Sequence, residues 1–336
     1  MNRCGRQTVV KNFKKEHIGV FRAVNVALPN DVELSRFNWR GSNFRNLPSA
    51  YNGNVALPVT FNGDTVYLAS NVTFDSPGKK TFNIRFVMYD LEDITDKALS
   101  DELVSTGAFE YKLNNGEFPL VSFSKSALDN APTTSKDAFH IKSYINAFYC
   151  SIKYYEFLYM TYGRGGIFDK DHDMVMFVNV RMSNAFWYES YIFYGNAKNE
   201  QTILPLTSMD ICCHELTHGL TQQTLKLVYS GESGALDESI ADMFGTFMEH
   251  YIAERGNMTD LPDWIVAENS FGQGIRNFAD PGQFEQPDAY KGKFWINPGW
   301  TWNDEGGVHC NSGVLNFFCY LAVHGAENGV RNNVNS

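Results

Sequence analysis

The 336-residue sequence contains no apolar run of the length that crosses a membrane, no solenoid-type repeat and no long low-complexity tract. A membrane helix needs about 18 consecutive apolar residues, so we expect no membrane span. Acidic residues outnumber basic ones, 38 to 28, and the net charge of −10 argues against a nucleic-acid partner. What the sequence does contain is a hydrophobic fraction of 43%, enough for a sizeable core, in a length typical of two domains.

Cysteine and histidine are scarce, with 6 and 8 copies. The cysteines do not follow a zinc-finger spacing. Cys212 and Cys213 are adjacent, Cys213 directly precedes His214, and Cys310 directly follows His309. These three cysteines either form a disulfide or act as small buried hydrophobic residues. We favour the second interpretation, because cysteines in helices are commonly buried.

The distribution of strand-like and helix-like segments predicts an α+β fold with two lobes. Residues 48–208 alternate short β-branched and aromatic runs with Gly, Asn and Asp turns, which predicts a β-rich N-terminal lobe. One stretch of this lobe, Asp137 to Tyr162, is predicted to be a long aromatic-rich helix. Residues 209–336 predict a mainly α-helical lobe, and residues 1–47 fit neither pattern and stay unassigned.

The most informative segment is His214-Glu215-Leu216-Thr217-His218, within a proline-free stretch that we expect to be helical. Side chains four residues apart lie on the same face of a helix, so both imidazoles can reach one zinc ion. Glu215 can contact a water on that ion without binding the ion itself. Taken alone, the pentapeptide is also compatible with two ordinary helical histidines.

A third ligand is available in the helix predicted over Asp237 to Glu249. A catalytic zinc ion commonly has three protein ligands and an open position for water. Glu238 is the candidate third ligand. Asp242 lies four residues later on the same helix face and can accept a hydrogen bond from the second nitrogen of a ligand histidine. Without the histidine motif, two solvated carboxylates would be the simpler interpretation.

These segments, in this order and spacing, closely resemble the thermolysin-like neutral zinc metalloproteases. The resemblance extends to Asn184-Ala185-Phe186-Trp187, to Tyr229, to Arg276 and to the segment around His309. It implies a zinc helix in the cleft between the two lobes. Because the family continues further at its C-terminus, the lobe formed by residues 209–336 is expected to be incomplete there. Residues 1–47 are interpreted as a remnant of the family's pro-segment.

The resemblance implies a zinc-dependent endopeptidase that hydrolyses peptide bonds with metal-activated water. Glu215 would be the general base, and Tyr229 and His309 would donate to the developing oxyanion. Asp304 would orient His309 and favour its protonated form. The alternative is a non-catalytic homologue that binds zinc and calcium but is inactivated by the loss of C-terminal helices.

The resemblance also assigns a substrate-binding surface. Asn184 and the backbone of Ala185 would hold an extended peptide, and Arg276 would bind a peptide carbonyl. Asp237 stands where the family has an asparagine that contacts the substrate. The pocket for the residue on the leaving-group side would favour a large hydrophobic side chain, because its expected lining is apolar: Ile203, Leu206, Ile211 and Ile275.

One calcium site is a further implication of the resemblance. Carboxylate oxygens suit calcium, and four acids occupy positions that hold calcium in the family: Asp210, Glu249, Asp263 and Glu268. Since Ile265 and Asn269 replace two more acids, we expect a single ion instead of a pair. A solvated acidic surface is the alternative interpretation.

The expected partners are peptide or protein substrates, and we expect a monomer. The family is normally secreted, which makes an extracellular location an implication of the resemblance. Residues Met1 to Val24 contain basic side chains throughout and show no apolar core of a signal peptide.

Overall fold

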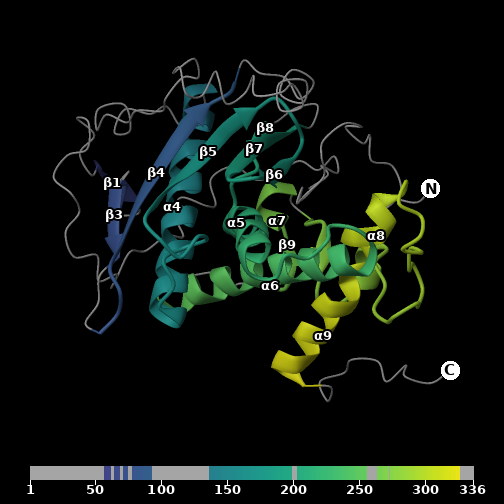
Figure 1. Ribbon diagram of the computed structural model, residues 1–336. Coiled ribbons are helices and arrows are strands. Elements are labelled where there is room, and N and C mark those ends of the chain that lie inside the picture. The colour runs from purple at the N-terminus through teal and green to yellow at the C-terminus, as the bar shows by residue number, and fades with distance from the viewer. Residues whose placement is uncertain are drawn as a thin grey trace, which may run out of the picture.

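Strands dominate the first part of the described chain and helices the second, which confirms the predicted α+β architecture (Figure 1). The computed structural model describes residues 57–61, 64–68, 71–74, 78–92, 136–198, 203–255, 263–271 and 273–325. The predicted N-terminal segment 1–47 and Cys4 lie outside these residues.

The strands of the β-rich region are β1 (Leu57–Phe61), β2 (Asp64–Leu68), β3 (Asn71–Phe74), β4 (Phe82–Asp90), β5 (His172–Val180), β6 (Ala185–Tyr188), β7 (Tyr191–Lys198) and β8 (Ile203–Pro205). The helices are α4 (Lys136–Tyr162), α5 (Met209–Thr224), α6 (Gly231–Arg255), α7 (Glu268–Phe271), α8 (Asp304–Asn311) and α9 (Gly313–His324). Three short elements complete the set: β9 (Ile265–Val266), β10 (Arg276–Asn277) and the 3-10 helix η2 (Pro281–Phe284).

A six-stranded mixed sheet forms the framework of the β-rich region. Its strand order is β3-β4-β5-β7-β6, and β8 pairs with β7. The β4–β5 and β5–β7 pairs are parallel, and the outer pairs are antiparallel. Parallel neighbours need a crossover connection, and helix α4 lies in the connection between β4 and β5. Strand β6 pairs only with β7 in the described part of the chain, so it forms an edge of the sheet.

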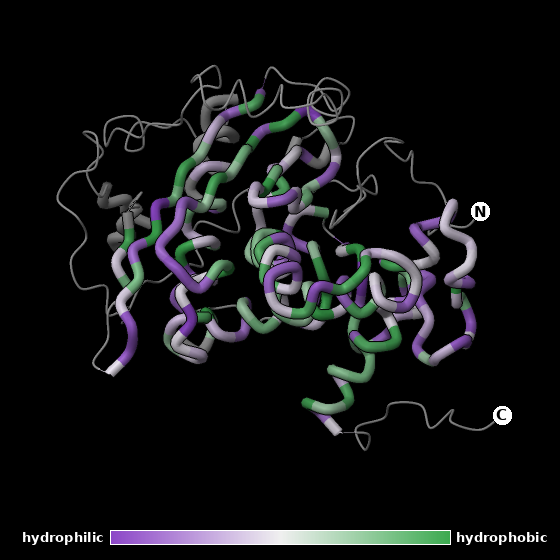
Figure 2. Tube along the Cα trace, in the orientation of Figure 1, coloured by the Kyte–Doolittle hydropathy of each residue, from purple (hydrophilic) through white to green (hydrophobic). Residues whose placement is uncertain are grey.

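The main core lies between this sheet and the helices. Along β4, the buried residues Phe82, Ile84, Phe86 and Met88 alternate with more exposed ones, as expected of a strand with one face against the core. Helix α4 supplies aromatic partners, for example Tyr155, whose ring centroid lies 5.2 Å from that of Phe86. Green apolar segments run through the sheet and the helices behind it (Figure 2).

A smaller cluster covers the opposite side of the sheet centre. It is built on Phe177, Phe186 and Phe193, which are buried together with Leu91, Val180 and Met182. The ring centroids of Phe177 and Phe186 each lie 4.7 Å from that of Phe193, in stacked arrangements. The strands β5, β6 and β7 are therefore apolar on both faces, which fixes the position of the edge strand β6.

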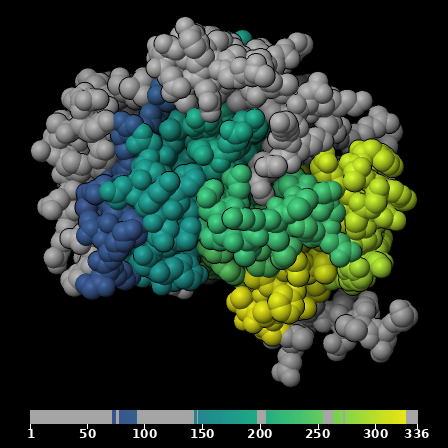
Figure 3. Space-filling model, viewed as in Figure 1, coloured from purple at the N-terminus to yellow at the C-terminus, as the bar shows by residue number. Residues whose placement is uncertain are grey.

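Helix α5 is buried on all sides over most of its length. Every residue from Met209 to Thr221 is buried, whereas a surface helix keeps a polar face in water. Helix α6 packs directly on α5, so closely that a Cβ atom on Gly245 would lie 2.7 Å from the backbone oxygen of Asp210. In Figure 3, α6 lies between the sheet region and the yellow C-terminal helices. Any polar side chain of α5 from Met209 to Thr221 is consequently held inside the molecule.

The last helix, α9, is mostly apolar (Figure 2) and exposes Phe318 and Val323. None of the helices in the described ranges is long and apolar enough to cross a membrane. Five cysteines fall in these ranges: Cys150, Cys212, Cys213, Cys310 and Cys319. All five are buried and none forms a disulfide there, which confirms the interpretation of Cys212, Cys213 and Cys310 as small buried residues.

Candidate active site

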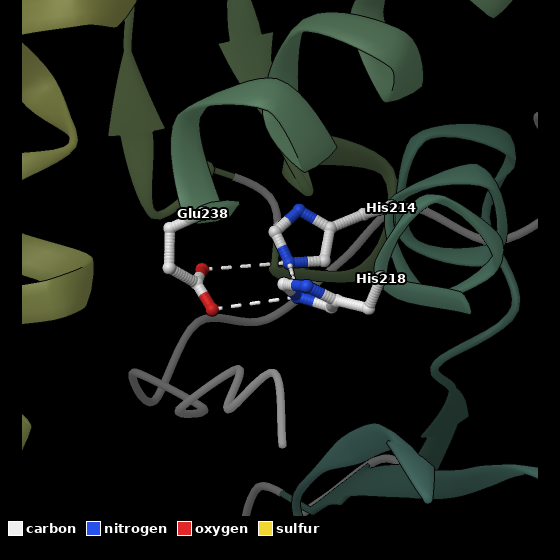
Figure 4. A group of neighbouring side chains, drawn as sticks. All are labelled: His214, His218 and Glu238. Atoms are coloured by element: carbon white, nitrogen blue, oxygen red, sulfur yellow. Dashed lines mark hydrogen bonds and ion pairs between the residues drawn. The ribbon is translucent and has the colours of Figure 1, made fainter. Parts of the chain in front are cut away.

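Helices α5 and α6 bring His214, His218 and Glu238 into one fully buried group (Figure 4). The Nε2 atoms of the two histidines lie 2.9 Å apart. The Glu238 carboxylate oxygens lie 3.5 Å from Nε2 of His214 and 3.4 Å from Nε2 of His218. Ligand atoms of a tetrahedral zinc ion, with bonds of about 2.0–2.2 Å, are separated by about 3.3–3.6 Å. The two separations from Glu238 fit a zinc ion bound by these three side chains, and the two Nε2 atoms lie closer together than that geometry.

The polar atoms that the group leaves unpaired support this fit. Oε2 of Glu238 is buried and has no hydrogen-bond partner among the described residues. A buried carboxylate oxygen without a donor is costly, and a bound cation would remove that cost. Both histidines present Nε2 to the carboxylate, so the Nδ1 atoms face the surrounding protein.

Asp242 contacts Nδ1 of His214, the ring nitrogen that does not face Glu238. Its carboxylate lies 2.9 Å from Nδ1 of His214 and accepts two hydrogen bonds of 2.6 Å from Nε and Nη2 of Arg276. Asn316 of α9 donates a further bond of 2.8 Å from Nδ2. Burial opposes ionisation of Asp242, but the Arg276 charge and the His214 hydrogen bond outweigh it and lower the pKa of Asp242. The carboxylate is thus fixed by donors from three different elements.

Glu215 follows His214 on the buried helix. Both of its carboxylate oxygens are buried and form no hydrogen bond of normal geometry with the described residues. Burial raises the pKa of Glu215 to about 7, against the opposing effect of positive charge on His214 and His218. A carboxyl group whose pKa lies near neutrality is suited to accept and release a proton at neutral pH.

Tyr229 and His309 lie on the other side of Glu238. The Tyr229 hydroxyl donates to Oε1 of Glu238 and lies 3.1 Å from Nε2 of His309. Nδ1 of His309 lies 2.5 Å from Oδ1 of Asp304. Burial lowers the pKa of His309, but the Glu238 and Asp304 carboxylates outweigh that effect and raise it to about 9. The structure therefore brings Tyr229, His309 and Asp304 together beside Glu238.

A segment with left-handed backbone conformation positions the Asp304 carboxylate beside the His309 ring. Asp304, Glu305, Gly306 and Gly307 all have positive φ angles, from 48° to 88°, at the start of α8. Oδ2 of Asp304 accepts the backbone N–H groups of His309 and Cys310, both at 3.0 Å. L-residues pay about 1–2 kcal/mol for this backbone region. The two glycines lower that cost, and the carboxylate compensates for part of the rest by capping the helix.

The predicted substrate-side residues lie on the edge strand and beside it. Ala185 begins the edge strand β6, and the backbone oxygen of the preceding Asn184 accepts a hydrogen bond of 2.8 Å from Gly195. Leu206 and Ile211 are fully buried in the main core, with Ile275 packed against it, and the side chain of Ile203 lies outside the described residues. Arg276 is buried in its ion pair with Asp242.

Asp237, which the family resemblance assigns to the substrate, has a fully buried side chain that lies between His218 and Thr221. Thr221 and Asn316 are contributors that sequence reasoning missed. Thr221 lies one turn after His218 on a helix already predicted, so helical spacing could have identified it. No sequence signal singles out Asn316, because it lies far along the chain from Asp242.

The four carboxylates predicted for calcium do not form a second group of close ligands in the described ranges. Asp210 is buried and accepts the backbone N–H groups of Ile211 and Ala267. Asp263 is exposed and accepts the N–H of Ile265 at 2.7 Å. Glu249 and Glu268 are partly buried, and Glu268 accepts a hydrogen bond of 2.6 Å from Asn269.

A mixed sheet followed by helices, with a buried His-His-Glu group where the two meet, defines the class of zinc metallopeptidases. Two family models match the chain, "Thermolysin metallopeptidase, catalytic domain" over residues 49–222 and "Thermolysin metallopeptidase, alpha-helical domain" over residues 225–335. The chain belongs to the thermolysin metallopeptidase family.

Curated relatives agree with this assignment. A zinc metalloproteinase of Renibacterium salmoninarum is 41% identical over 149 residues, which are 43% of this chain and 25% of that protein. A bacillolysin of Bacillus cereus is 33% identical over 188 residues, 54% of this chain and 31% of that protein. A thermolysin of Alicyclobacillus acidocaldarius is 39% identical over 149 residues, again 43% and 25% of the two chains. The chain thus spans less than a third of the length of these relatives.

Among solved structures, the precursor of protealysin, a metalloproteinase from Serratia proteamaculans, has the same fold. It superposes with a TM-score of 0.52 at 24% sequence identity, over 70% of this chain and 67% of that chain.

Proposed function

We propose that the chain is a zinc-dependent endopeptidase that hydrolyses peptide bonds in peptide or protein substrates. The observation that carries this proposal is the position of Glu215, a buried carboxylate next to a ligand of the His-His-Glu group. Hydrolysis needs a base beside the site where water is activated. The pKa of about 7 suits Glu215 to that task.

The residues of the site divide the chemistry between them. Zinc, when bound, would supply Lewis acidity for the substrate carbonyl and for water. Glu215 would accept the proton of the attacking water and transfer it to the leaving amine. His309, held through Nδ1 by Asp304, and the Tyr229 hydroxyl would donate hydrogen bonds to the carbonyl oxygen as negative charge develops on it.

The fold also supports a position for the substrate. An edge strand has unpaired backbone groups that can add an extended peptide as a further strand. Strand β6 is such an edge in the described chain, it begins at Ala185, and it contacts α5. We propose that the substrate backbone pairs there with Asn184 and Ala185, and that Arg276 binds a substrate carbonyl. The expected preference is for a large hydrophobic residue on the leaving-group side, which is supported by the apolar character of Leu206, Ile211 and Ile275.

Calcium binding, an extracellular location and a monomeric state stay predictions from the family resemblance. A calcium site is supported by the short distance along the structure between the segments that carry these acids. The backbone N–H of Ala267 donates a hydrogen bond to Asp210, so the segment that contains Asp263 and Glu268 lies against the start of α5. Glu249 lies on α6, which packs on the same helix.

Replacing Glu215 with Gln tests the proposed activity. The substitution keeps the size of the side chain but removes the base, so kcat/KM for a peptide with Leu or Phe after the scissile bond should fall by about 100-fold or more. Zinc content, measured by atomic absorption, should not change. The matched control is Glu232→Gln, an exposed carboxylate that bonds the Tyr290 hydroxyl.

Two results would contradict the proposal. One is a zinc-loaded protein that cleaves none of a set of such peptides, which would favour the non-catalytic alternative. The other is an active protein in which Glu215→Gln has the same kcat/KM as the parent.

A further inference from the structure

Two tryptophans are exposed on the surface just before α8. Trp300 and Trp302, the tryptophan pair, are 50% and 76% exposed, and their rings are stacked with centroids 6.2 Å apart. Neither indole forms a hydrogen bond or another ring contact with the described residues. An indole is a large apolar surface, and exposed apolar surface gathered in one place often marks a site of interaction. The tryptophan pair is therefore a candidate contact for a partner.

The backbone around the tryptophan pair is ordered by its own hydrogen bonds. The N–H of Trp300 donates to the Asn297 carbonyl and the N–H of Asn303 donates to the Trp300 carbonyl, both at 2.9 Å, so two successive turns carry the pair. Ile296, just before these turns, is buried, and both its N–H and its carbonyl bond the side chain of Asn311. A surface that is already ordered loses less conformational entropy when a partner binds.

The turn that carries Trp302 leads directly into the active site. The Asn303 carbonyl accepts the N–H of Gly306 at 3.1 Å. Trp302 comes two residues before Asp304, so their Cα atoms are at most about 7 Å apart. Asp304 in turn lies against the His309 ring, whose side chain is 12% exposed while that of Glu238 is fully buried. The tryptophan pair and the exposed edge of His309 thus belong to one connected segment.

The same segment contacts the start of α6, which follows Tyr229. A Cβ atom on Gly231 would lie 3.1 Å from Cβ of Pro298. The Ser230 hydroxyl donates to the backbone oxygen of Glu305 at 3.1 Å. The residues around the tryptophan pair therefore touch both chain segments that carry the proposed oxyanion donors. The segment between η2 and α8 runs along the outside of the helical region (Figure 1).

The length of an extended peptide matches this arrangement. A strand advances about 3.3 Å per residue, so four residues cover roughly 13 Å. The path from His309 through Asp304 to the tryptophan pair is of the same order. A peptide that ends next to the scissile bond would not reach the pair, whereas one that continues for about four more residues would.

We propose that Trp300 and Trp302 bind apolar side chains of a polypeptide substrate about three to five residues away from the scissile bond. The inference rests on the proposed function, and it adds a preference for long substrates that are apolar at that distance. A polypeptide is the expected partner because the surface continues into the residues that would bind the reacting carbonyl.

The test uses two peptides of equal length with the same central residues and Leu after the scissile bond. Both are extended by about four residues at each end, with Leu side chains in one extension and Ser in the other. Cleavage of the central bond is followed by liquid chromatography and mass spectrometry. The measured quantity is kcat/KM for the Leu-extended peptide divided by kcat/KM for the Ser-extended one.

This Leu-to-Ser ratio should fall by about 3–10-fold in Trp300→Ser and in Trp302→Ser, the effect of losing one aromatic contact. Trp302→Phe keeps an apolar ring and should keep most of the ratio. Tyr162→Ser is the matched control, because Tyr162 is 62% exposed but lies at the end of α4. Its ratio should equal that of the parent.

A second measurement does not depend on turnover. The dissociation constants of both labelled peptides are measured by fluorescence anisotropy with Glu215→Gln as the background protein. Adding Trp302→Ser to that background should weaken binding of the Leu-extended peptide by about 3–10-fold relative to the Ser-extended one. Circular dichroism checks the fold of each variant, and if one of the two Ser variants does not fold, the other decides the comparison.

Three results would overturn the inference. One is a pair of folded Ser variants that keep the parent's Leu-to-Ser ratio in both kcat/KM and affinity. Another is a dimer, seen by sedimentation velocity, that Trp302→Ser dissociates, because a second copy would then cover the pair. The third is quenching of tryptophan fluorescence by cellohexaose that Trp302→Ser abolishes, without any effect of the variant on the peptides.

Failure of the inference and failure of the proposed function give different results. A protein that cleaves the central bond but shows no Leu-to-Ser difference contradicts the inference alone. A protein whose tryptophan pair binds the Leu-extended peptide, but which cleaves neither peptide when loaded with zinc, contradicts the proposed function alone.

Discussion

Replacing Arg276 with Met should strongly destabilise the fold. The guanidinium donates two hydrogen bonds of 2.6 Å to Asp242, and the two side chains are 5% and 0% exposed. Methionine fills a similar volume but leaves the carboxylate with His214 and Asn316 as its remaining donors. Removal of one partner from a buried ion pair costs about 3–5 kcal/mol. Whole domains are stable by about 5–15 kcal/mol, so this loss would be a large fraction of the total.

The assay is urea unfolding of the zinc-free protein at pH 7.5, followed by far-UV circular dichroism. A loss of 3–5 kcal/mol corresponds to a decrease of at least about 100-fold in the ratio of folded to unfolded protein, since 1.4 kcal/mol is a factor of ten. Adding Asp242→Asn to Arg276→Met removes the uncompensated charge. The double variant should therefore be more stable than Arg276→Met alone, which is the sign of strong coupling between the two sites.

Two outcomes would refute this reasoning. One is a destabilisation of less than about 1 kcal/mol for Arg276→Met, the value typical of an exposed ion pair. The other is a double variant whose loss equals the sum of the two single losses, because additivity would mean that the residues do not depend on each other.

Two further predictions concern other parts of the chain. Gly306→Ala should lower the free energy of unfolding by about 2 kcal/mol or more, because φ is +88° and the new Cβ would lie 2.5 Å from the Pro298 oxygen. The control Gly78→Ala, at φ +79° with open space around it, should lower it by about 1–2 kcal/mol. Equal urea midpoints for the two variants would contradict this prediction. His172 has a lowered pKa because of burial, so the unfolded chain binds more protons below about pH 6.5. Its contribution to stability is complete above that pH and is lost as the pH falls below it, and His172→Gln should show a shallower loss of urea midpoint between pH 7 and 5.

Local patterns were sufficient to predict the main elements. The aromatic stretch predicted to form a helix from Asp137 corresponds to α4, which begins at Lys136. The strand-like character predicted for residues 48–208 is found in β4, where burial alternates every two residues as expected of a strand with one face against the core. The helical spacing of His214 and His218, and of Glu238 and Asp242, placed these four side chains on two helix faces that then meet in the structure.

What the sequence could not predict depends on which elements pack together. Asn316 reaches Asp242 only because α9 packs on α6, and nothing in the local sequence specifies that contact. The surroundings of Asp237 depend on packing in the same way. Its neighbour Glu238 was known to face the ligands, but the direction of Asp237 follows from how deeply α6 sits on α5. The Gly306-Gly307 pair was visible in the sequence, yet its left-handed turn includes two non-glycine residues held there by the Asp304 hydrogen bonds.

The burial of α5 from Met209 to Thr221 has a consequence for which substitutions this protein can accept. The helix that carries the ligands and the base is also the centre of the hydrophobic core. Substitutions at positions Met209 to Thr221 would therefore reduce the proposed activity and the amount of folded protein together. A screen of a mutant library for folded protein would then select the same variants at these positions as a screen for activity. Variation in the proposed substrate preference then has to arise outside this helix, at partly exposed positions such as Asn184 and Tyr188 beside the edge strand β6, because the other three residues of that strand are themselves buried.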